Sequence, residues 1–293
     1  MLVHYAFGGG FGHLTRTQVL RHSLALSGPC ATLCASPLAE EADFKQALRP
    51  RFAAPGLATN PQALGQWLLD ELGRLQARTL YVDVFPGGIL GELCGLSLPD
   101  DLELVLVARL LKWETYAQIL KGPLPRFSRA LLTEALPADQ LQRLRSVSAE
   151  LSPVALVDSP ASSAQMAQLD AILTRWKQFE RPVWLLVHAG AQTEIAELFA
   201  YACECARSEG VVPHWVLVAP EQPLADFGNI EWLNFRPARM LFPHVARIFT
   251  AAGFNAMRET AQWQHKHHCL PFARRYDDQF LRKRLRQGAD QYV

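Results

Sequence analysis

The chain has 293 residues, of which 49% are hydrophobic and 19% are charged, enough to bury one large or two ordinary cores. Its formal net charge of +1 provides no overall field that would attract nucleic acid or an anionic membrane. We expect no nucleic-acid partner, and an acidic partner or a membrane surface is left open. The N-terminus lacks the pattern of a signal peptide, and no apolar run approaches the roughly 20 residues that span a bilayer. We therefore expect a cytoplasmic protein without a transmembrane segment.

Strand-like and helix-like segments alternate along the whole sequence, which predicts an α/β fold with parallel sheets. In the first half we expect strands at 2–6, 30–35, 79–84, 102–108 and 130–133, and helices at 15–25 and 61–77. In the second half we expect strands at 154–157, 183–187, 214–219, 230–233, 248–251 and 269–272, and helices at 165–179, 194–208, 256–264 and 280–286.

A segment rich in serine and proline around 152–163 marks the expected domain boundary. It divides the chain into an N-terminal Rossmann-like domain, 1–152, and a C-terminal one, 153–293, whose terminal helix is free to pack back on the first domain. Ligands of open α/β folds bind at the carboxyl edges of the strands, so we expect the two domains to face one another across a ligand-binding cleft.

The first predicted strand is followed by a glycine turn that contains Gly10 and Gly12 and leads into a helix at His13. Such a turn brings backbone N–H groups and a helix N-terminus up to a ligand. An imidazole at this point titrates near neutral pH and suits general base catalysis. The alternative is a tight turn without a function.

A late predicted strand ends at Gly253, and the helix after it is expected to begin with Asn255 as its N-cap. The N–H groups and partial positive charge of a helix N-terminus suit a diphosphate, and the nearby carboxylate of Glu259 can accept hydrogen bonds from ribose hydroxyls. The alternative is an ordinary capped helix in which Glu259 is solvated or paired with Arg258.

Two further loops have the composition of ligand-binding segments. The loop 188–193 follows a strand and contains Gly190, whose lack of a side chain lets a backbone approach a ligand. The segment 271–279 ends in Asp278 and Gln279, whose polar side chains suit the hydroxyls of a sugar. An ordinary turn is the alternative for each loop.

The segment 265–269 contains three histidines and a cysteine, which are metal-ligand residue types. Their crowding within five residues disfavours a tetrahedral site formed by this segment alone, so we expect no metal there. The basic residues near the C-terminus are interleaved with acidic and aromatic ones, and we interpret them as a solvated helix face instead of a nucleic-acid surface.

Three ordered motifs resemble those of GT-B nucleotide-sugar glycosyltransferases and together cover nearly the whole chain. They are Gly-Phe-Gly-His-Leu-Thr-Arg near the N-terminus, Ala-Gly-Phe-Asn-Ala-Met-Arg-Glu after a late strand, and Pro-Phe-Ala-x-x-x-Asp-Asp-Gln before the last helix. Within that class the chain resembles the bacterial branch that includes the N-acetylglucosaminyltransferase of peptidoglycan synthesis. The segment 81–92 is similar to part of uncharacterised members of this group, and the resemblance places Asp83 at the cleft.

The resemblance implies a glycosyltransferase whose second domain binds a nucleotide-sugar, with a UDP-sugar as the expected donor. It implies His13 as the general base toward an acceptor hydroxyl, or as a group that stabilises the developing charge. It implies Asp83 as a residue that orients His13 or binds the acceptor. No metal or other cofactor is implied, because the helix dipole and N–H groups can neutralise the diphosphate. The implied donor-binding residues are Gly10, Gly12, Gly190, Gly253, Phe254, Asn255, Glu259 (on the ribose), Asp278 and Gln279 (both on the donor sugar).

Two other functions remain open at this stage. The motif G-x-G-H-x-x-R and the short chain equally resemble the UDP-sugar hydrolase of pseudaminic acid synthesis, in which case His13 would activate water. The chain could also be a non-catalytic GT-B relic that binds a nucleotide or a protein partner. The acceptor is not readable from the sequence.

Overall fold

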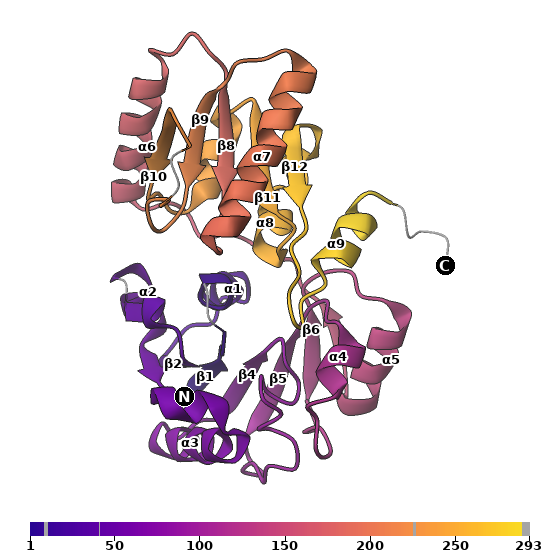
Figure 1. The fold of residues 1–293 in the computed structure, drawn as a ribbon. Coiled ribbons are helices and arrows are strands. Elements are labelled where there is room, and N and C mark those ends of the chain that lie inside the picture. The colour runs from indigo at the N-terminus through magenta and orange to yellow at the C-terminus, as the bar shows by residue number, and fades with distance from the viewer. Residues whose placement is uncertain (9–10, 41, 225–226, 289–293) are drawn as a thin grey trace. The chain divides into compact units, whose positions relative to one another are not determined.

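The computed structural model describes residues 1–8, 11–40, 42–224 and 227–288 (Figure 1). The chain forms two compact units: unit 1 comprises Met1–Ser159 together with Arg275–Asp277, and unit 2 comprises Pro160–Arg274 and the residues from Asp278 onward. The division after Ser159 falls a few residues beyond the expected boundary at 152. The terminal helix belongs to unit 2.

Unit 1 contains a seven-stranded parallel sheet, which confirms the expected α/β class. Its strand order is β3-β2-β1-β4-β5-β6-β7, so the order reverses at the neighbouring strands β1 and β4. Such a reversal creates a crevice at the carboxyl ends of the strands, where open α/β sheets bind ligands. The strands are β1 Leu2–Tyr5, β2 Cys30–Cys34, β3 Pro50–Phe52, β4 Thr79–Asp83, β5 Glu103–Ala108, β6 Arg129–Leu132 and β7 Leu151–Pro153.

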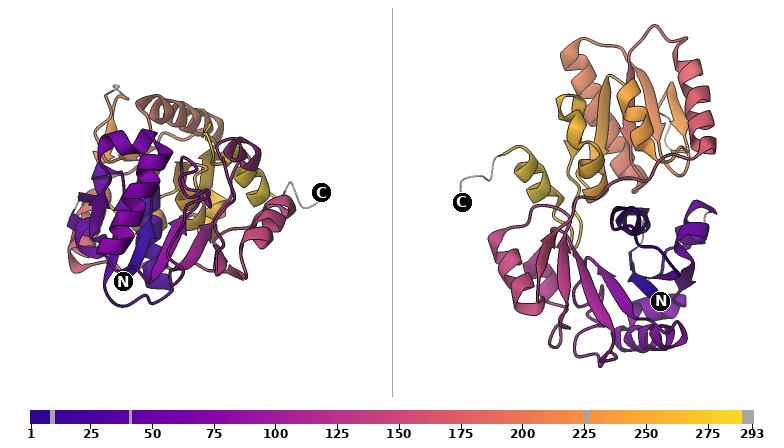
Figure 2. Two further views of the ribbon diagram at one scale, coloured as in Figure 1. Left: turned by 90° about the horizontal axis from the view of Figure 1, so that it is seen from below. Right: turned by 180° about the vertical axis from the view of Figure 1, so that it is seen from behind.

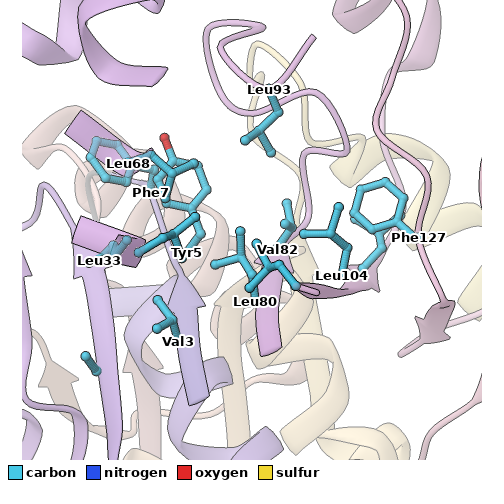
Figure 3. Close-up of a cluster of buried hydrophobic side chains, with 14 of the residues drawn as sticks. Val3, Tyr5, Phe7, Leu33, Leu68, Leu80, Val82, Leu93, Leu104 and Phe127 are labelled. Atoms are coloured by element: carbon cyan, nitrogen blue, oxygen red, sulfur yellow. The ribbon is translucent and has the colours of Figure 1, made fainter. Parts of the chain in front are cut away.

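Helices cover both faces of this sheet because the strand side chains alternate between two apolar clusters. On one face Leu80 and Val82 belong to a cluster with Leu64 and Leu68 of α3. Figure 3 shows Leu68, Leu80 and Val82 of this cluster. On the other face the intervening Tyr81 packs with α1. Each fully buried leucine contributes about 2 kcal/mol of hydrophobic stabilisation.

The helices of unit 1 are α1 Phe11–Ser23, α2 Ala42–Leu48, α3 Pro61–Arg74, α4 Trp113–Ala117 and α5 Ala138–Val147, with short 3-10 helices at Pro37–Glu40 and Pro55–Thr59.

Unit 2 contains a five-stranded parallel sheet in the order β10-β9-β8-β11-β12. Its strands are β8 Val183–Val187, β9 His214–Val218, β10 Ile230–Leu233, β11 Arg247–Ala251 and β12 His267–Leu270. Its helices are α6 Ser163–Trp176, α7 Gln192–Glu209, α8 Phe254–Glu259 and α9 Gln279–Arg286, with 3-10 helices at Ala238–His244 and Ala261–Lys266.

The sheet of unit 2 is also covered on both faces. Leu185 of β8 packs with the α6 cluster, and its neighbour Leu186 packs with the α7 cluster on the opposite face. Helix α7 lies in front of the sheet in Figure 1 and behind it in the right-hand view of Figure 2. Of the helices in the described residues, none is long and apolar enough to cross a membrane.

Two strand predictions differ from the structure, and one observed strand, β3, has no counterpart among the predictions. The strand expected at 154–157 is wrong: β7 lies at Leu151–Pro153, because its partner β6 ends at Leu132, opposite Pro153. β3 was not expected, because a three-residue edge strand that begins with proline carries little pattern. β12 begins two residues before the expected strand, at His267, because its histidines pair in register with β11 although they are not apolar.

Candidate functional site

His13 and Asp83 form a hydrogen-bonded pair in unit 1. His13 lies in the first turn of α1, after β1, and Asp83 is the last residue of the neighbouring strand β4. The imidazole Nδ1 is 2.6 Å from the Asp83 Oδ2, and the two side chains are 13% and 6% exposed. The pair therefore lies where the strand order of unit 1 reverses, the position at which ligands of such sheets bind.

Arg16 completes this arrangement from the next turn of α1. Its Nε donates to Oδ1 of Asp83 at 2.7 Å and its Nη2 donates to Oδ2 at 2.6 Å. Arg16 is only 3% exposed, so this is a buried, fork-shaped ion pair. Arg16 was not among the expected site residues, although its spacing of three from His13 places both side chains on one face of a helix.

The buried charges determine the protonation of the pair. Burial raises the pKa of Asp83, but the Arg16 guanidinium and His13 outweigh that effect and hold the pKa well below its usual range. Burial also lowers the pKa of His13, and it outweighs the opposing attraction of Asp83. At neutral pH the imidazole is therefore neutral. Its Nδ1–H donates to the ionised Asp83, and Nε2 is left to accept a proton.

Gly8, between β1 and α1, makes room for the imidazole. A Cβ atom on Gly8 would lie 2.1 Å from His13 Cδ2 and 2.2 Å from Nε2, so only glycine fits there. Gly12 is the second residue of α1. Gly10 lies outside the residues that the structure describes, and the roles of Gly10 and Gly12 in donor binding stay predictions.

The chain turns sharply directly after Asp83. The backbone N–H of Phe85 donates to the Asp83 carbonyl at 3.0 Å, and Val84 between them has a φ of 75°. This is a γ-turn with a positive central φ, an uncommon conformation that is strained for a β-branched residue. The turn brings the Phe85 ring to a centroid distance of 6.1 Å from the His13 ring. Backbone strain of this kind concentrates at functional sites.

The loop that follows is organised around the carboxylate of Glu92. This carboxylate accepts a hydrogen bond from the Tyr5 hydroxyl at 2.5 Å and from the backbone N–H groups of Ile89 and Leu90 at 3.1 and 2.7 Å. Gly88 has a φ of 83°, and a Cβ there would overlap the same carboxylate. Burial raises the pKa of Glu92. Glu92 thus holds the loop shape that supports Phe85.

The segment Arg275–Asp277 also belongs to unit 1. Tyr276 packs against Phe85 at a centroid distance of 5.7 Å, and its carbonyl accepts a hydrogen bond from the Lys112 N–H at 2.7 Å. Asp277 pairs with the mostly buried Arg109 at 2.9 Å. The residues directly before Asp278 are thereby fixed to the part of unit 1 that flanks His13.

In unit 2 the turn after β11 presents an open backbone. The N-cap of α8 is Gly253, not Asn255 as expected, because the helix begins two residues earlier, at Phe254. A Cβ on Gly253 would meet only the Gln279 Nε2, at 3.9 Å, so the protein does not fill the space above this turn. Phe254 is 5% exposed, which limits its part in a site to its backbone.

Glu259 is the last residue of α8, and its Oε1 lies 3.2 Å from Arg258 Nη2. The carboxylate is therefore paired with Arg258, which is one of the two alternatives expected for it. The Glu259 side chain is 14% exposed, and its role on a ribose stays a prediction.

Gln279 lies beside the Gly253 turn, whereas Asp278 caps helix α9. Gln279 is 4% exposed, and its Oε1 accepts a hydrogen bond from the Phe272 N–H at 3.0 Å, which leaves its Nε2 directed at the Gly253 turn. Asp278 instead caps α9, accepting from the Leu281 N–H at 2.9 Å. Gln279 is therefore beside the proposed donor turn, whereas the expected contact of Asp278 with a donor sugar stays a prediction.

Gly190 accommodates a hydrogen bond between two side chains. His188 Nε2 lies 2.8 Å from Glu194 Oε2, and a Cβ on Gly190 would overlap both groups. Arg274 forms an ion pair with the same carboxylate, and its Nη2 lies 2.6 Å from Oε2. Burial raises the pKa of Glu194, but Arg274 and His188 outweigh it and lower the pKa. A negative charge thus stands at the start of α7, and the part of Gly190 in donor binding stays a prediction.

Within the described parts of the chain, no group of three or more His, Cys, Asp or Glu side chains is arranged to hold a metal ion.

No protein-family model matches the chain, and no curated protein does. Among solved structures it is similar to the glycotransferase of kitacinnamycin, with a TM-score of 0.60, 13% identity, and coverage of 98% of this chain and 84% of that one. A ugt transferase from Siraitia grosvenorii in complex with UDP has a TM-score of 0.53 and 14% identity, over 97% of this chain and 82% of that one.

UDP-GlcNAc 2-epimerase from Neisseria meningitidis, bound to UDP-GlcNAc, is also similar, with a TM-score of 0.51 and 13% identity over 86% of this chain and 78% of that one. At such identities these similarities concern the fold. The chain has the GT-B fold, which confirms the expected fold class.

Proposed function

We propose that this protein is a metal-independent glycosyltransferase that moves a sugar from a UDP-sugar to an acceptor hydroxyl, with His13 as the general base. The observation that carries the proposal is the buried set of His13, Asp83 and Arg16 at the strand reversal of unit 1. A neutral imidazole with one nitrogen bound to an ionised carboxylate is a poised base. An ordinary turn would not need this set of buried charges.

In the proposed reaction, the oxygen of the acceptor hydroxyl attacks the anomeric carbon of the donor. His13 Nε2 takes the proton of that hydroxyl at the same time. The bond between that carbon and the diphosphate oxygen breaks, and the diphosphate leaves with the electron pair. Asp83 stabilises the imidazolium that forms, and Arg16 keeps Asp83 ionised and in place.

Unit 2 is proposed to bind the donor. The diphosphate would contact the backbone of Gly253, Phe254 and Asn255, with Glu259 on the ribose and Gln279 on the sugar. The open space at Gly253 and the position of Gln279 support this assignment. So does the order of the three motifs, which resembles that of the bacterial transferase branch. The choice of UDP agrees with the nucleotides named for two similar structures.

A nucleotide-sugar hydrolase is the second candidate. The same His13 nitrogen that would accept the proton of an acceptor hydroxyl could accept that of water, so the geometry of unit 1 serves both reactions. A hydrolase would release UDP from its substrate at full rate without an acceptor, whereas a transferase would do so slowly.

Calorimetric titration of UDP, GDP and dTDP into the wild-type protein and an Asn255→Ala, Glu259→Ala double variant tests the donor site. We expect UDP to bind selectively and the double variant, which lacks the Glu259 carboxylate proposed to bind the ribose, to lose that binding. A His13→Ala variant should retain it. Absence of binding by all three nucleotides would overturn the donor assignment. If UDP binds, release of UDP from UDP-sugars with and without candidate acceptors then separates a transferase from a hydrolase.

A further inference from the structure

A pocket of about 390 Å³ in unit 2 is lined by none of the residues proposed for donor binding, although its lining includes Met257 of α8. It opens beside the edge strand β12 and is bounded by α7, α8 and α9. Its wall includes His267, His268 and Cys269 of β12, Tyr201 of α7, and Lys283 and Arg286 of α9. The volume lies within the range of about 300–1,000 Å³ that is usual for small-molecule sites.

The two cations of the pocket stand on one face of α9. Lys283 and Arg286 are three residues apart, which places their side chains next to each other on a helix. Like charges at this spacing repel, and no acidic residue is among the described residues that line the pocket. The nearby Glu209 is itself bound to Arg247, at 3.1 and 2.8 Å. The pocket therefore has a net positive charge that the described lining does not neutralise.

Among the described residues, the hydrogen-bond partners of Arg286 are neutral groups. Its Nη1 donates to the Met257 carbonyl at 2.5 Å and to Thr260 Oγ1 at 3.1 Å, which fixes the guanidinium at the end of α8. Its Nη2 is enclosed and makes no hydrogen bond to the described residues. A guanidinium fixed in this way without a carboxylate partner is the usual means of binding a planar or tetrahedral oxyanion.

The remaining lining groups are neutral and able to form hydrogen bonds. Burial lowers the pKa of His267 to about 3, and its Nε2 lies 2.9 Å from Thr250 Oγ1, so this ring adds no charge. Burial raises the pKa of Cys269 and raises that of Tyr201 to about 12, so the thiol and the phenol stay protonated. The hydroxyl of Tyr201 and the amides of Gln264 and Gln287 can serve the uncharged part of a ligand.

We propose that this pocket is a binding site for a small phosphate monoester, such as a sugar phosphate, with Lys283 and Arg286 on the phosphoryl group. Two cations match the charge of a phosphate monoester at neutral pH, which is about −1.5 to −2. The polar neutral groups around them match sugar hydroxyls. This site is separate from the one in the proposed function and does not depend on it.

The test is calorimetric titration of glucose 6-phosphate into the full chain, with glucose as the uncharged control ligand. We expect glucose 6-phosphate to bind and glucose not to bind. Lys283→Gln and Arg286→Gln should each weaken the affinity by about tenfold or more, since each removes a charge-assisted contact. Arg284→Gln, which removes the exposed cation between them on α9, should leave the affinity unchanged.

Arg286→Gln also removes the contacts to α8, so its melting temperature is measured first, and Lys283→Gln tests the site independently if Arg286→Gln does not fold. The Asn255→Ala, Glu259→Ala double variant should bind glucose 6-phosphate like the wild type even if it loses UDP. Absence of binding to the wild type, equal weakening by Arg284→Gln, or loss of binding in the donor-site double variant would each overturn the proposal.

Discussion

Arg16 and Asp83 are joined by two parallel hydrogen bonds, from Nε to Oδ1 at 2.7 Å and from Nη2 to Oδ2 at 2.6 Å, with both side chains nearly inaccessible to solvent. The same Oδ2 accepts the hydrogen bond from His13 Nδ1. One carboxylate therefore holds both the cation and the imidazole, and the charge states of Asp83 and His13 depend on this arrangement.

Removal of the base should abolish turnover and leave nucleotide binding intact. We expect His13→Ala to lower kcat by about 10²–10⁴-fold, the usual contribution of a positioned general base. His22→Ala, which changes an exposed histidine on the same helix, is the matched control. Steady-state rates and UDP calorimetry measure the two effects. Unchanged turnover in His13→Ala would remove His13 from the mechanism.

Arg16 should act through its two neighbours. Arg16→Lys keeps the charge but loses the fork, and we expect kcat to fall by about 10- to 100-fold with little change in KM. Arg16→Gln also removes the charge, which leaves Asp83 buried without its cation and costs about 3–5 kcal/mol of unfolding free energy. Urea unfolding of both variants, alongside their kinetics, separates the positioning effect from loss of folding.

The pH profile provides a readout that a purely structural role of Arg16 would not change. His13 works as a base only when it is neutral, and burial lowers its pKa, so wild-type kcat/KM should fall only below pH 6.5. Arg16 also lowers the pKa of His13. In any folded Arg16→Gln protein the acid limb of kcat/KM should therefore move to higher pH. An unmoved limb would argue against coupling between Arg16 and His13.

Gly8 should tolerate no side chain, because a Cβ there would lie 2.1 Å from the His13 ring. We expect Gly8→Ala to displace the imidazole and lower kcat by about 100-fold, since a misplacement of about 1 Å can have that effect. Gly56→Ala is the control, because a Cβ at Gly56 meets nothing within 4 Å. If both variants retain wild-type rates, the imidazole does not act from the position shown here.

His4 should make the stability of unit 1 depend on pH. It is 2% exposed, its ring stacks on Tyr81, and burial lowers its pKa from 6.5 to about 3. The unfolded chain therefore binds a proton at His4 that the folded chain does not bind. This contribution to stability is complete above about pH 6.5 and is lost progressively as the pH falls toward 3.

Replacement of His4 by phenylalanine keeps a ring for stacking and removes the titration. We expect His4→Phe to lose less unfolding free energy than the wild type between pH 7.5 and pH 5, measured by urea unfolding at both values. Equal losses in the two proteins would show that His4 is not the titrating group.

The strand and helix pattern predicted the α/β class, and most strands lie within two residues of their expected positions, because a buried parallel strand is a nearly continuous apolar run. The pattern of apolar residues did not predict the start of β12 or the presence of β3, because these segments are not apolar. β12 begins with two histidines and β3 with a proline and an arginine, and both are strands because a neighbouring strand supplies hydrogen-bond partners.

His13, Asp83 and Gly253 could be selected from the sequence because each ends a strand or begins a helix in a recognisable motif. Residue types alone did not determine the partners of these residues. The pairing of Arg16 with Asp83 joins positions 67 residues apart, and the capping of α9 by Asp278 and the pair between Glu194 and Arg274 depend on side-chain directions.

The amino-acid sequence by itself thus determined the alternation of strands and helices and the position of the glycine turns, because these depend on local periodicity and on the conformational freedom of single residues. Only the tertiary structure decided which charges meet, which of them are buried and which proton His13 keeps. The pairing, burial and protonation of these groups depend on distances across the sheet and on the exclusion of water, which cannot be inferred from a local sequence pattern.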